Sequence, residues 1–339
     1  MKPSDIIRTM QAISKAKPPV LLSGPPGVGK SQMCRQLASL LEGKFLDVRL
    51  IYHDPSDLKF PIADVQKRMI YWVNSLFPQD REWRGIICLE ELAQCPQLMH
   101  AAAMQITLDR RCGDYILPDG AWVVACSNRQ EDRAGCHRMI TPLLNRFVHL
   151  DVEVDHKDWN MWAMENGIIP EVRGYLNFKP TSLMTFDPKL NERAFGTPRS
   201  WEMVSNVHPL VSFDLETQVT EGIVGTVAHE YIGFARNYRD LPDPDGVIAN
   251  PEKAMIPKEP SIAIALCTAL ADRAKDASEK QLRGIMQYAD RLPDEYSCLL
   301  VRDAAFVNSE ITCINEAAAW MKKHRDILYP AGGYIGGKN

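Results

Sequence analysis

Long apolar runs are missing from this sequence of 339 residues. A helix that crosses a membrane needs about 20 consecutive apolar residues, and no stretch approaches that length. The residues from Met1 to Asp5 also lack the apolar core that a secretion signal requires. We therefore expect a cytoplasmic protein that has no membrane partner.

Paired metal-binding motifs are also missing, although the chain has nine cysteines. The cysteines are scattered singly without a C-x-x-C pair, and the eight histidines show no H-E-x-x-H spacing. The sequence predicts neither a zinc site nor a redox couple. Most of the cysteines are expected to pack as small buried hydrophobic residues.

The sequence also lacks an excess of basic residues. Lysine and arginine together number 39 against 43 aspartates and glutamates, which gives a formal net charge of −4. A protein whose whole surface attracts nucleic acid carries the opposite balance. The composition therefore argues against a nucleic-acid partner, although a local basic pore is compatible with it.

The most specific pattern that is present is a glycine-rich segment directly after the apolar run at residues 19–22. It matches G-x-x-x-x-G-K-S/T and comprises Gly24, Pro25, Pro26, Gly27, Val28, Gly29, Lys30, Ser31 and Gln32. Its glycines let backbone N–H groups point at an anion, its lysine adds charge, and its serine can ligate Mg²⁺. Apolar residues at helical spacing follow over residues 31–41. We predict a phosphate-binding loop for a nucleoside triphosphate, rather than a glycine-proline turn without a ligand.

Short apolar runs alternate with amphipathic stretches in the first half of the chain, which is typical of a parallel sheet with helices on both faces. Helices are expected to dominate from about residue 155. We predict an α/β core over residues 1–155, a helical part over 156–239, and a linker with a helical block over 240–339. The five expected strands lie at residues 20–23, 45–51, 85–89, 122–127 and 148–152. Residues 54–83 are expected to be long and irregular, because their three prolines block a continuous helix.

An apolar strand over residues 85–89 ends in two carboxylates, Glu90 and Glu91. In an ATPase with a phosphate-binding loop, this is the place of an acid that supports Mg²⁺ and of a base that activates water. Glu90 would support the metal ion together with Ser31, and Glu91 would act as the base. Aspartate is more usual at the first position, but glutamate keeps the charge. The alternative is a pair of acids at a solvated strand end.

Three further polar residues follow predicted elements. Asn128 ends the strand over residues 122–127, at the sheet edge where ligands bind, and can orient water or contact the γ-phosphate; it could also be an ordinary turn residue. Arg146 comes near the end of a short helix, and its guanidinium suits stabilisation of a transferring phosphoryl group. Arg199 lies in the first turn of a helix, where a bound phosphate would offset its repulsion by the helix dipole.

The order of these motifs resembles that of AAA+ ATPases of the MoxR and dynein-related branch, and the resemblance covers nearly the whole chain. The motifs resemble those of the bacterial and phage MoxR-like ATPases that act alongside von Willebrand factor A domain proteins. The segments that carry it are Leu89-Glu90-Glu91-Leu92, Leu108-Asp109-Arg110-Arg111, Tyr115-Ile116-Leu117-Pro118-Asp119-Gly120, Asn145-Arg146-Phe147-Val148-His149-Leu150 and Thr197-Pro198-Arg199-Ser200-Trp201.

The resemblance implies a P-loop AAA+ core, an all-α lid over residues 156–239 and a C-terminal helical block, with ATP and Mg²⁺ as cofactors. It also implies a ring of identical subunits, usually a hexamer, in which an arginine finger acts on the neighbouring site. The roles that it assigns are Walker A for Lys30 and Ser31, Walker B for Glu90 and Glu91, sensor 1 for Asn128, arginine finger for Arg146 and sensor 2 for Arg199. Arg133 and Arg138 are lesser candidates for the finger.

Members of this branch carry an inserted loop that faces the central pore, and residues 54–72 occupy its place. Lys67, Arg68, Tyr71 and Trp72 would there grip a partner protein, or the two aromatic residues simply pack the loop down. Our leading hypothesis is an ATP hydrolase that remodels or activates a protein partner in a chaperone-like way. A nucleic-acid motor and a non-hydrolysing assembly module that depends on ATP are the alternatives.

Overall fold

The computed structural model describes residues 1–54, 57–58, 60–74, 76–113, 115–132, 138–190, 192–239 and 241–324. These residues form two compact units. The first combines residues 1–158 with 184–192 and 197–199, and the second combines 159–183 and 193–196 with the described residues from 200 onward. The three-part division that we expect from the sequence stays a prediction.

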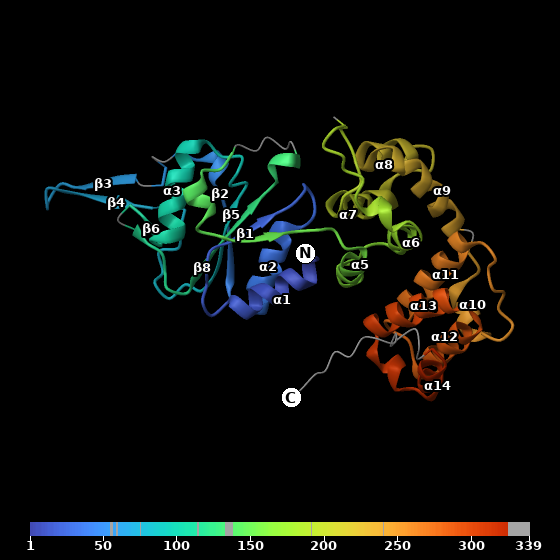
Figure 1. Ribbon diagram of the computed structural model, residues 1–339. Helices are drawn as coiled ribbons and strands as arrows, with labels where there is room; N and C mark the ends of the chain where they lie inside the picture. Colours follow the sequence, from blue (N-terminus) through green and yellow to red (C-terminus); the bar gives the residue numbers. More distant parts are fainter. Residues whose placement is uncertain are drawn as a thin grey trace. The chain divides into compact units, whose positions relative to one another are not determined.

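A parallel five-stranded sheet forms the centre of the first unit (Figure 1). In spatial order its strands are β2 (Lys44–Arg49), β5 (Gly85–Glu90), β8 (Ala121–Ser127), β1 (Val20–Ser23) and β9 (Val148–Asp151). Each predicted strand is present within two residues of its expected ends, which confirms the predicted α/β sheet. The carboxyl ends of all five strands therefore meet at one edge, and every strand whose end carries a predicted site residue belongs to this sheet.

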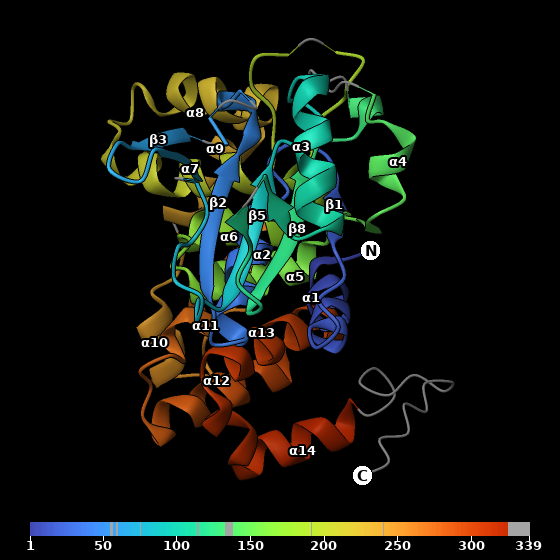
Figure 2. The same cartoon turned by 90° about the vertical axis from the view of Figure 1, so that its left-hand side faces the viewer.

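Helices cover both faces of the sheet, and Figure 2 shows α3 in front of the strands and α2 behind them. On one face, α1 (Pro3–Ile13) and α2 (Lys30–Leu40) pack against alternate residues of β1 and β8. On the other face, α3 (Gln97–Leu108) and the short α4 (Thr141–Leu144) pack against the remaining residues of the same strands. All seven residues of β8 are buried, because a central strand of such a sheet has no solvent-facing side.

Residues 54–83 differ from the sequence prediction of an irregular segment. They contain an antiparallel hairpin formed by β3 (Phe60–Asp64) and β4 (Met69–Val73), drawn at the far left of Figure 1. The prediction was wrong because a proline excludes a helix interior but is tolerated in an edge strand, and Pro61 lies in a ladder of only two strands. The Tyr71 and Trp72 side chains, which we expected to face a pore, lie outside the described part of the structure.

A second hairpin follows α3. Its strands are β6 (Arg111–Cys112) and β7 (Tyr115–Ile116), and it lies where the turn-rich sequence after Cys112 favours a hairpin. Short 3₁₀ turns also occur between the larger elements of both units. They are η1 (Leu50–Tyr52), η2 (Gln130–Asp132), η3 (Pro180–Leu183), η4 (His208–Leu210), η5 (Gly225–Val227) and η6 (Ser309–Cys313).

The second unit is helical. Its helices are α5 (His156–Glu165), which begins in the first unit, α6 (Pro170–Phe178), α7 (Pro198–Val207), α8 (Glu216–Val224), α9 (Ala228–Arg239), α10 (Pro244–Ala249), α11 (Pro260–Arg273), α12 (Glu279–Arg291), α13 (Asp294–Val307) and α14 (Asn315–Lys323). Gly225 ends α8 with a φ of 72°, and a side chain there would lie 2.4 Å from the Ala194 carbonyl. No helix among the described residues is long and apolar enough to span a membrane.

Candidate nucleotide-binding site

The glycine-rich loop joins β1 to α2 at the carboxyl edge of the sheet. Gly27 and Gly29 both adopt positive φ angles, 77° and 90°, and Gly29 caps the helix that begins at Lys30. The Gly24 amide donates a 3.3 Å hydrogen bond to the Ser127 carbonyl, which fixes the loop to the end of β8. The sequence thus brings the free N–H groups of the first turn of α2 to the sheet edge, where they can bind an anion.

The other members of the predicted loop serve this geometry in different ways. Val28 is buried in the core beneath α2, whereas Gln32 is exposed on the helix. Pro25 and Pro26 are partly buried, and the Pro25 carbonyl accepts a hydrogen bond from Lys30.

The two positive-φ glycines have different surroundings. A Cβ atom added to Gly27 would lie 2.7 Å from the Thr197 hydroxyl oxygen, whereas one added to Gly29 would meet no described atom within 4 Å. The position beside Gly29, next to the first turn of α2, is therefore open, whereas the position beside Gly27 is filled by Thr197. We call this open position the cradle, and a phosphate oxygen beside the N–H groups of the first turn is compatible with it.

Alanine at these two glycines is expected to separate folding from nucleotide binding. Both changes carry the cost of a left-handed backbone, about 1–2 kcal/mol, but Gly27→Ala also overlaps Thr197 and should lose a further ~1–3 kcal/mol of unfolding free energy. Gly29→Ala should instead fill the cradle and weaken ATP binding by tenfold or more, about 1.4 kcal/mol. Urea unfolding without nucleotide and titration with a fluorescent ATP analogue measure the two effects. Equal destabilisation by both changes would contradict this reading of the loop.

Lys30 is held inside the loop by three oxygen atoms. Its ammonium group donates hydrogen bonds to the carbonyls of Gly24 at 2.8 Å and Pro25 at 3.0 Å, and to the side-chain oxygen of Asn128 at 2.9 Å. Burial lowers the pKa of Lys30 to about 8, with a smaller contribution from the Arg199 guanidinium, while nearby acidic groups oppose the shift. Lys30 and Asn128, which are 98 residues apart in the chain, therefore meet at the phosphate loop.

Glu90 ends β5 with its side chain 7% exposed, and the Cys88 thiol donates to its carboxylate over 3.2 Å. Burial raises the pKa of Glu90, and hydrogen bonds from Ser31 and Cys88 act in the opposite direction. The Ser31 hydroxyl and the Glu90 carboxylate are thus adjacent, and both are hard oxygen ligands of the kind that Mg²⁺ prefers. The longer glutamate still reaches the serine, so the predicted Mg²⁺-holding pair fits the chemistry of the ion.

Glu91 follows in a left-handed backbone conformation, with a φ of 55°. The chain turns there, since the Leu92 amide donates to the Cys126 carbonyl at 3.2 Å and the Gln94 amide donates to the Glu91 carbonyl at 2.9 Å. A residue other than glycine in this conformation costs about 1–3 kcal/mol, and such residues cluster at functional sites. The turn leaves the Glu91 side chain partly exposed, next to the buried Glu90.

The two predicted arginines differ in what they contact. The Arg199 amide donates a 3.2 Å hydrogen bond to the Gly27 carbonyl, and its guanidinium is close enough to affect the pKa of Lys30. The Arg146 guanidinium instead donates to the Pro142 carbonyl of helix α4, which ends two residues before Arg146. Arg199 therefore lies at the phosphate loop, whereas Arg146 contacts α4. Arg138 is exposed, and Arg133 lies outside the described residues.

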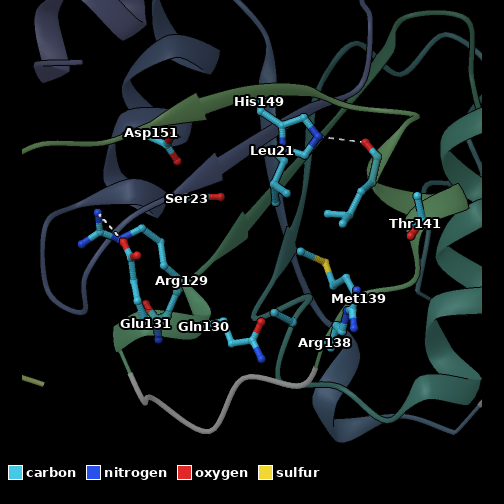
Figure 3. A pocket seen from close by; sticks show the side chains of 13 residues that line it. Leu21, Ser23, Arg129, Gln130, Glu131, Arg138, Met139, Thr141, His149 and Asp151 are labelled. Atoms are coloured by element: carbon cyan, nitrogen blue, oxygen red, sulfur yellow. Dashed lines mark hydrogen bonds and ion pairs between the residues drawn. The ribbon is translucent and has the colours of Figure 1, made fainter.

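A pocket of about 450 Å³ is lined by Asn128, by the turn that follows it and by Thr141 of α4 (Figure 3). Arg129 pairs with Glu131 on one side of it, at 3.2 Å, and the His149 ring meets the Leu144 carbonyl on another. The turn after Asn128 is clamped by Asp132, which accepts bonds from the Arg129 amide at 2.9 Å and from its guanidinium at 3.1 Å. Sequence reasoning missed Asp132, although the R-x-x-D spacing of this turn was available as a signal.

Comparison with known proteins bears on the same segment of the chain. Residues 19–149 match the family described as AAA domain (dynein-related subfamily). The match supports an AAA domain over these residues. It covers the phosphate loop, Glu90, Glu91, Asn128 and Arg146, and the five-stranded sheet lies almost entirely inside it.

Solved structures that resemble the chain do so weakly. NtrX from Brucella abortus in complex with ATP is 16% identical, with a TM-score of 0.39, and the match covers 96% of this chain and 68% of that one. A mutant of RuvB from Thermotoga maritima is 15% identical, with a TM-score of 0.39, and the match covers 82% of this chain and 86% of that one. No curated protein matches the sequence. The functional assignment therefore depends on the AAA domain and its side chains.

Proposed function

We propose that this AAA domain binds and hydrolyses ATP with Mg²⁺, and that the chain acts as a MoxR-like ring, usually a hexamer, in the cytoplasm. The ring would remodel or activate a protein partner, such as one with a von Willebrand factor A domain. The observation that carries the proposal is the meeting of Lys30, Asn128 and the Ser31–Glu90 pair at one sheet edge. These residues come from three separate parts of the sequence, and each matches the role that ATP hydrolysis requires.

The roles of the charged groups follow from their positions. Lys30 would exchange its loop carbonyls for phosphate oxygens, and Arg199 would add a second positive charge beside the loop. Ser31 and Glu90 would hold Mg²⁺, which when bound neutralises charge on the transferred phosphoryl group. Glu91 would take the proton from the attacking water, and Asn128 would orient that water or contact the γ-phosphate.

Arg146 would complete the site of a neighbouring subunit. Its guanidinium is placed by the Pro142 carbonyl on the short helix α4, and a planar cation of this kind stabilises the charge of a transferring phosphoryl group. A finger supplied by the neighbour makes hydrolysis depend on assembly, which is the physical basis of the proposed ring.

The basic pair before the second hairpin supports a protein partner over a nucleic acid. Arg110 adopts a φ of 52°, and its guanidinium donates to the carbonyls of Pro118 at 2.7 Å and Ala121 at 2.9 Å. Arg110 therefore braces the hairpin that ends at Ile116, and it is not available as one of two phosphate contacts. The one arginine of the pair that remains, Arg111, would attract the phosphates of a nucleic acid only weakly.

The experiment that tests the proposed function is phosphate release by the full chain, with Lys30→Ala as the variant that removes the phosphate-binding charge. We expect Mg²⁺-dependent release by the wild type, loss of ATP binding and release in Lys30→Ala, and no stimulation by DNA. ATP binding without release would favour the assembly module instead. Stimulation by DNA with a steep salt dependence would favour the nucleic-acid motor.

Asp132→Ala is expected to lower kcat by about tenfold while ATP affinity stays within twofold, because a loosened turn displaces Asn128 and small displacements of this kind reduce rates. Asp132 is 4% exposed and fixes the turn through Arg129. Glu131→Gln is the matched control, since exposed Glu131 pairs with the same arginine without clamping the turn. Steady-state phosphate release measures kcat. A change in ATP affinity without a change in kcat would count against this role.

A further inference from the structure

Three cysteines that are far apart in the sequence meet beneath the phosphate loop. Cys34 lies on α2, Cys88 on β5 and Cys126 on β8, and each is fully buried. The Cys126 sulfur is 3.7 Å from that of Cys34 and 3.5 Å from that of Cys88, and all three sulfurs lie within 4.8 Å of one another. In the described part of the chain this is the one group of metal-ligating side chains found so close together.

The spacing of these sulfurs suits a metal ion. An ion equidistant from three sulfurs so arranged can come within about 2–2.5 Å of each, which includes the ~2.3 Å of a zinc–thiolate bond. The ligands stand on two adjacent parallel strands and on the helix that packs over them. Rigid elements therefore hold the three donors in place, which is what a preorganised metal site requires.

A fourth ligand is within reach. The Glu90 carboxylate lies 3.2 Å from the Cys88 sulfur, at the edge of the cluster that faces the phosphate loop. A tetrahedral site takes four ligands, and thiolate and carboxylate donors are both accepted by Zn²⁺. Three thiolates, one carboxylate and one divalent ion leave two negative charges, and Lys30 is close enough to interact electrostatically with both Cys126 and Glu90.

We propose that Cys34, Cys88 and Cys126 form a buried site for one thiophilic metal ion, Zn²⁺ or a similar soft ion, with the Glu90 carboxylate as the fourth ligand. Binding releases the three thiol protons to solvent, and no oxidation or reduction takes place. Because Glu90 is also the acid proposed to support Mg²⁺, the soft ion would withdraw it and inhibit ATP hydrolysis. That last consequence rests on the proposed function, whereas the site itself does not.

The test is uptake of Cd²⁺ by the reduced full chain, followed by its ultraviolet sulfur-to-metal absorption and by the metal content after desalting. The wild type should bind one ion more than Cys34→Ala or Cys126→Ala, with a correspondingly stronger band. Cys95→Ala is the matched control, because Cys95 is equally buried but lies outside the cluster, and it should match the wild type. Equal uptake by Cys34→Ala and the wild type would overturn the proposal.

A second measurement keeps the site testable even where a variant fails to fold. X-ray absorption at the cadmium edge, on wild type with one equivalent of ion, should show three sulfur neighbours, and a shell with two or fewer would overturn the proposal. Measurements of phosphate release then test the second part of the proposal, the inhibition of ATP hydrolysis by the bound ion, apart from the metal site itself. Inhibition by one equivalent of Zn²⁺ in the wild type, relieved in Cys34→Ala, supports the shared Glu90, whereas uptake without inhibition shows that Glu90 is not shared. A chain that takes up the ion, but that releases no phosphate even when it is free of the ion, would contradict the proposed function alone.

Discussion

Replacing Glu91 with glutamine should stop ATP hydrolysis while leaving ATP binding intact. The side chain directly follows the buried Glu90 and is partly exposed at the sheet edge, where it can take a proton from water. A positioned general base contributes on the order of 10²–10⁴-fold to a rate, and kcat should fall by that factor. Glutamine has the same shape and keeps the left-handed turn at φ 55°, so neither the fold nor the phosphate loop should change.

The measurement is steady-state phosphate release, paired with titration of a fluorescent ATP analogue to show that binding survives. Glu42→Gln is the matched control, because Glu42 is an exposed glutamate with nearly the same backbone conformation, φ 52°, and it follows the far end of α2. The control should hydrolyse ATP like the wild type. Wild-type turnover by Glu91→Gln would show that another group activates the water.

Removing the Arg146 guanidinium should have a comparably large effect, and one that a second subunit can repair. An arginine finger raises kcat by a factor on the order of 10³–10⁵, so Arg146→Ala alone should be nearly inactive. In a mixture of Arg146→Ala with Glu91→Gln, some interfaces pair an intact base on one subunit with an intact finger on the next. Part of the activity should therefore return when two inactive proteins are mixed.

Phosphate release against protein concentration measures this sharing of sites. Wild-type turnover per chain should rise cooperatively as rings form, because assembly follows mass action. Arg138→Ala is the control, since exposed Arg138 is the other described candidate for the finger, and its mixture with Glu91→Gln should behave like wild type diluted with Glu91→Gln. Turnover that is independent of concentration, without recovery in the mixture, would indicate a site made by one chain alone.

The sheet and the phosphate loop could be predicted because their signals are local. Apolar runs fix the strands, and the loop needs glycine where φ is positive, as at Gly27 and Gly29. The β3–β4 hairpin was missed because Pro61 was interpreted only as a helix breaker. The roles assigned to Glu91, Arg146 and Arg199 stay predictions until they are measured.

The cysteine cluster and the Asp132 clamp depend on a different kind of information. Cys88 and Cys126 come together because β5 and β8 pair in one particular register, and a register cannot be read from the spacing of two residues along the chain. Cys34 joins them only because α2 packs on that face of the sheet. Such sites require the tertiary arrangement, whereas the phosphate loop requires only nine consecutive residues and the strand before them.

If the chain binds ATP as proposed, the hydrogen bond between Lys30 and Asn128 would respond to the nucleotide. Phosphate oxygens that draw the lysine toward them would break this hydrogen bond, and departure of those oxygens would let it form again. Asn128 directly precedes the turn that Asp132 clamps, and it lines the pocket that Thr141 of α4 also lines. Arrival and departure of the nucleotide's phosphates would thereby change the hydrogen bonding of a residue at the wall of this pocket.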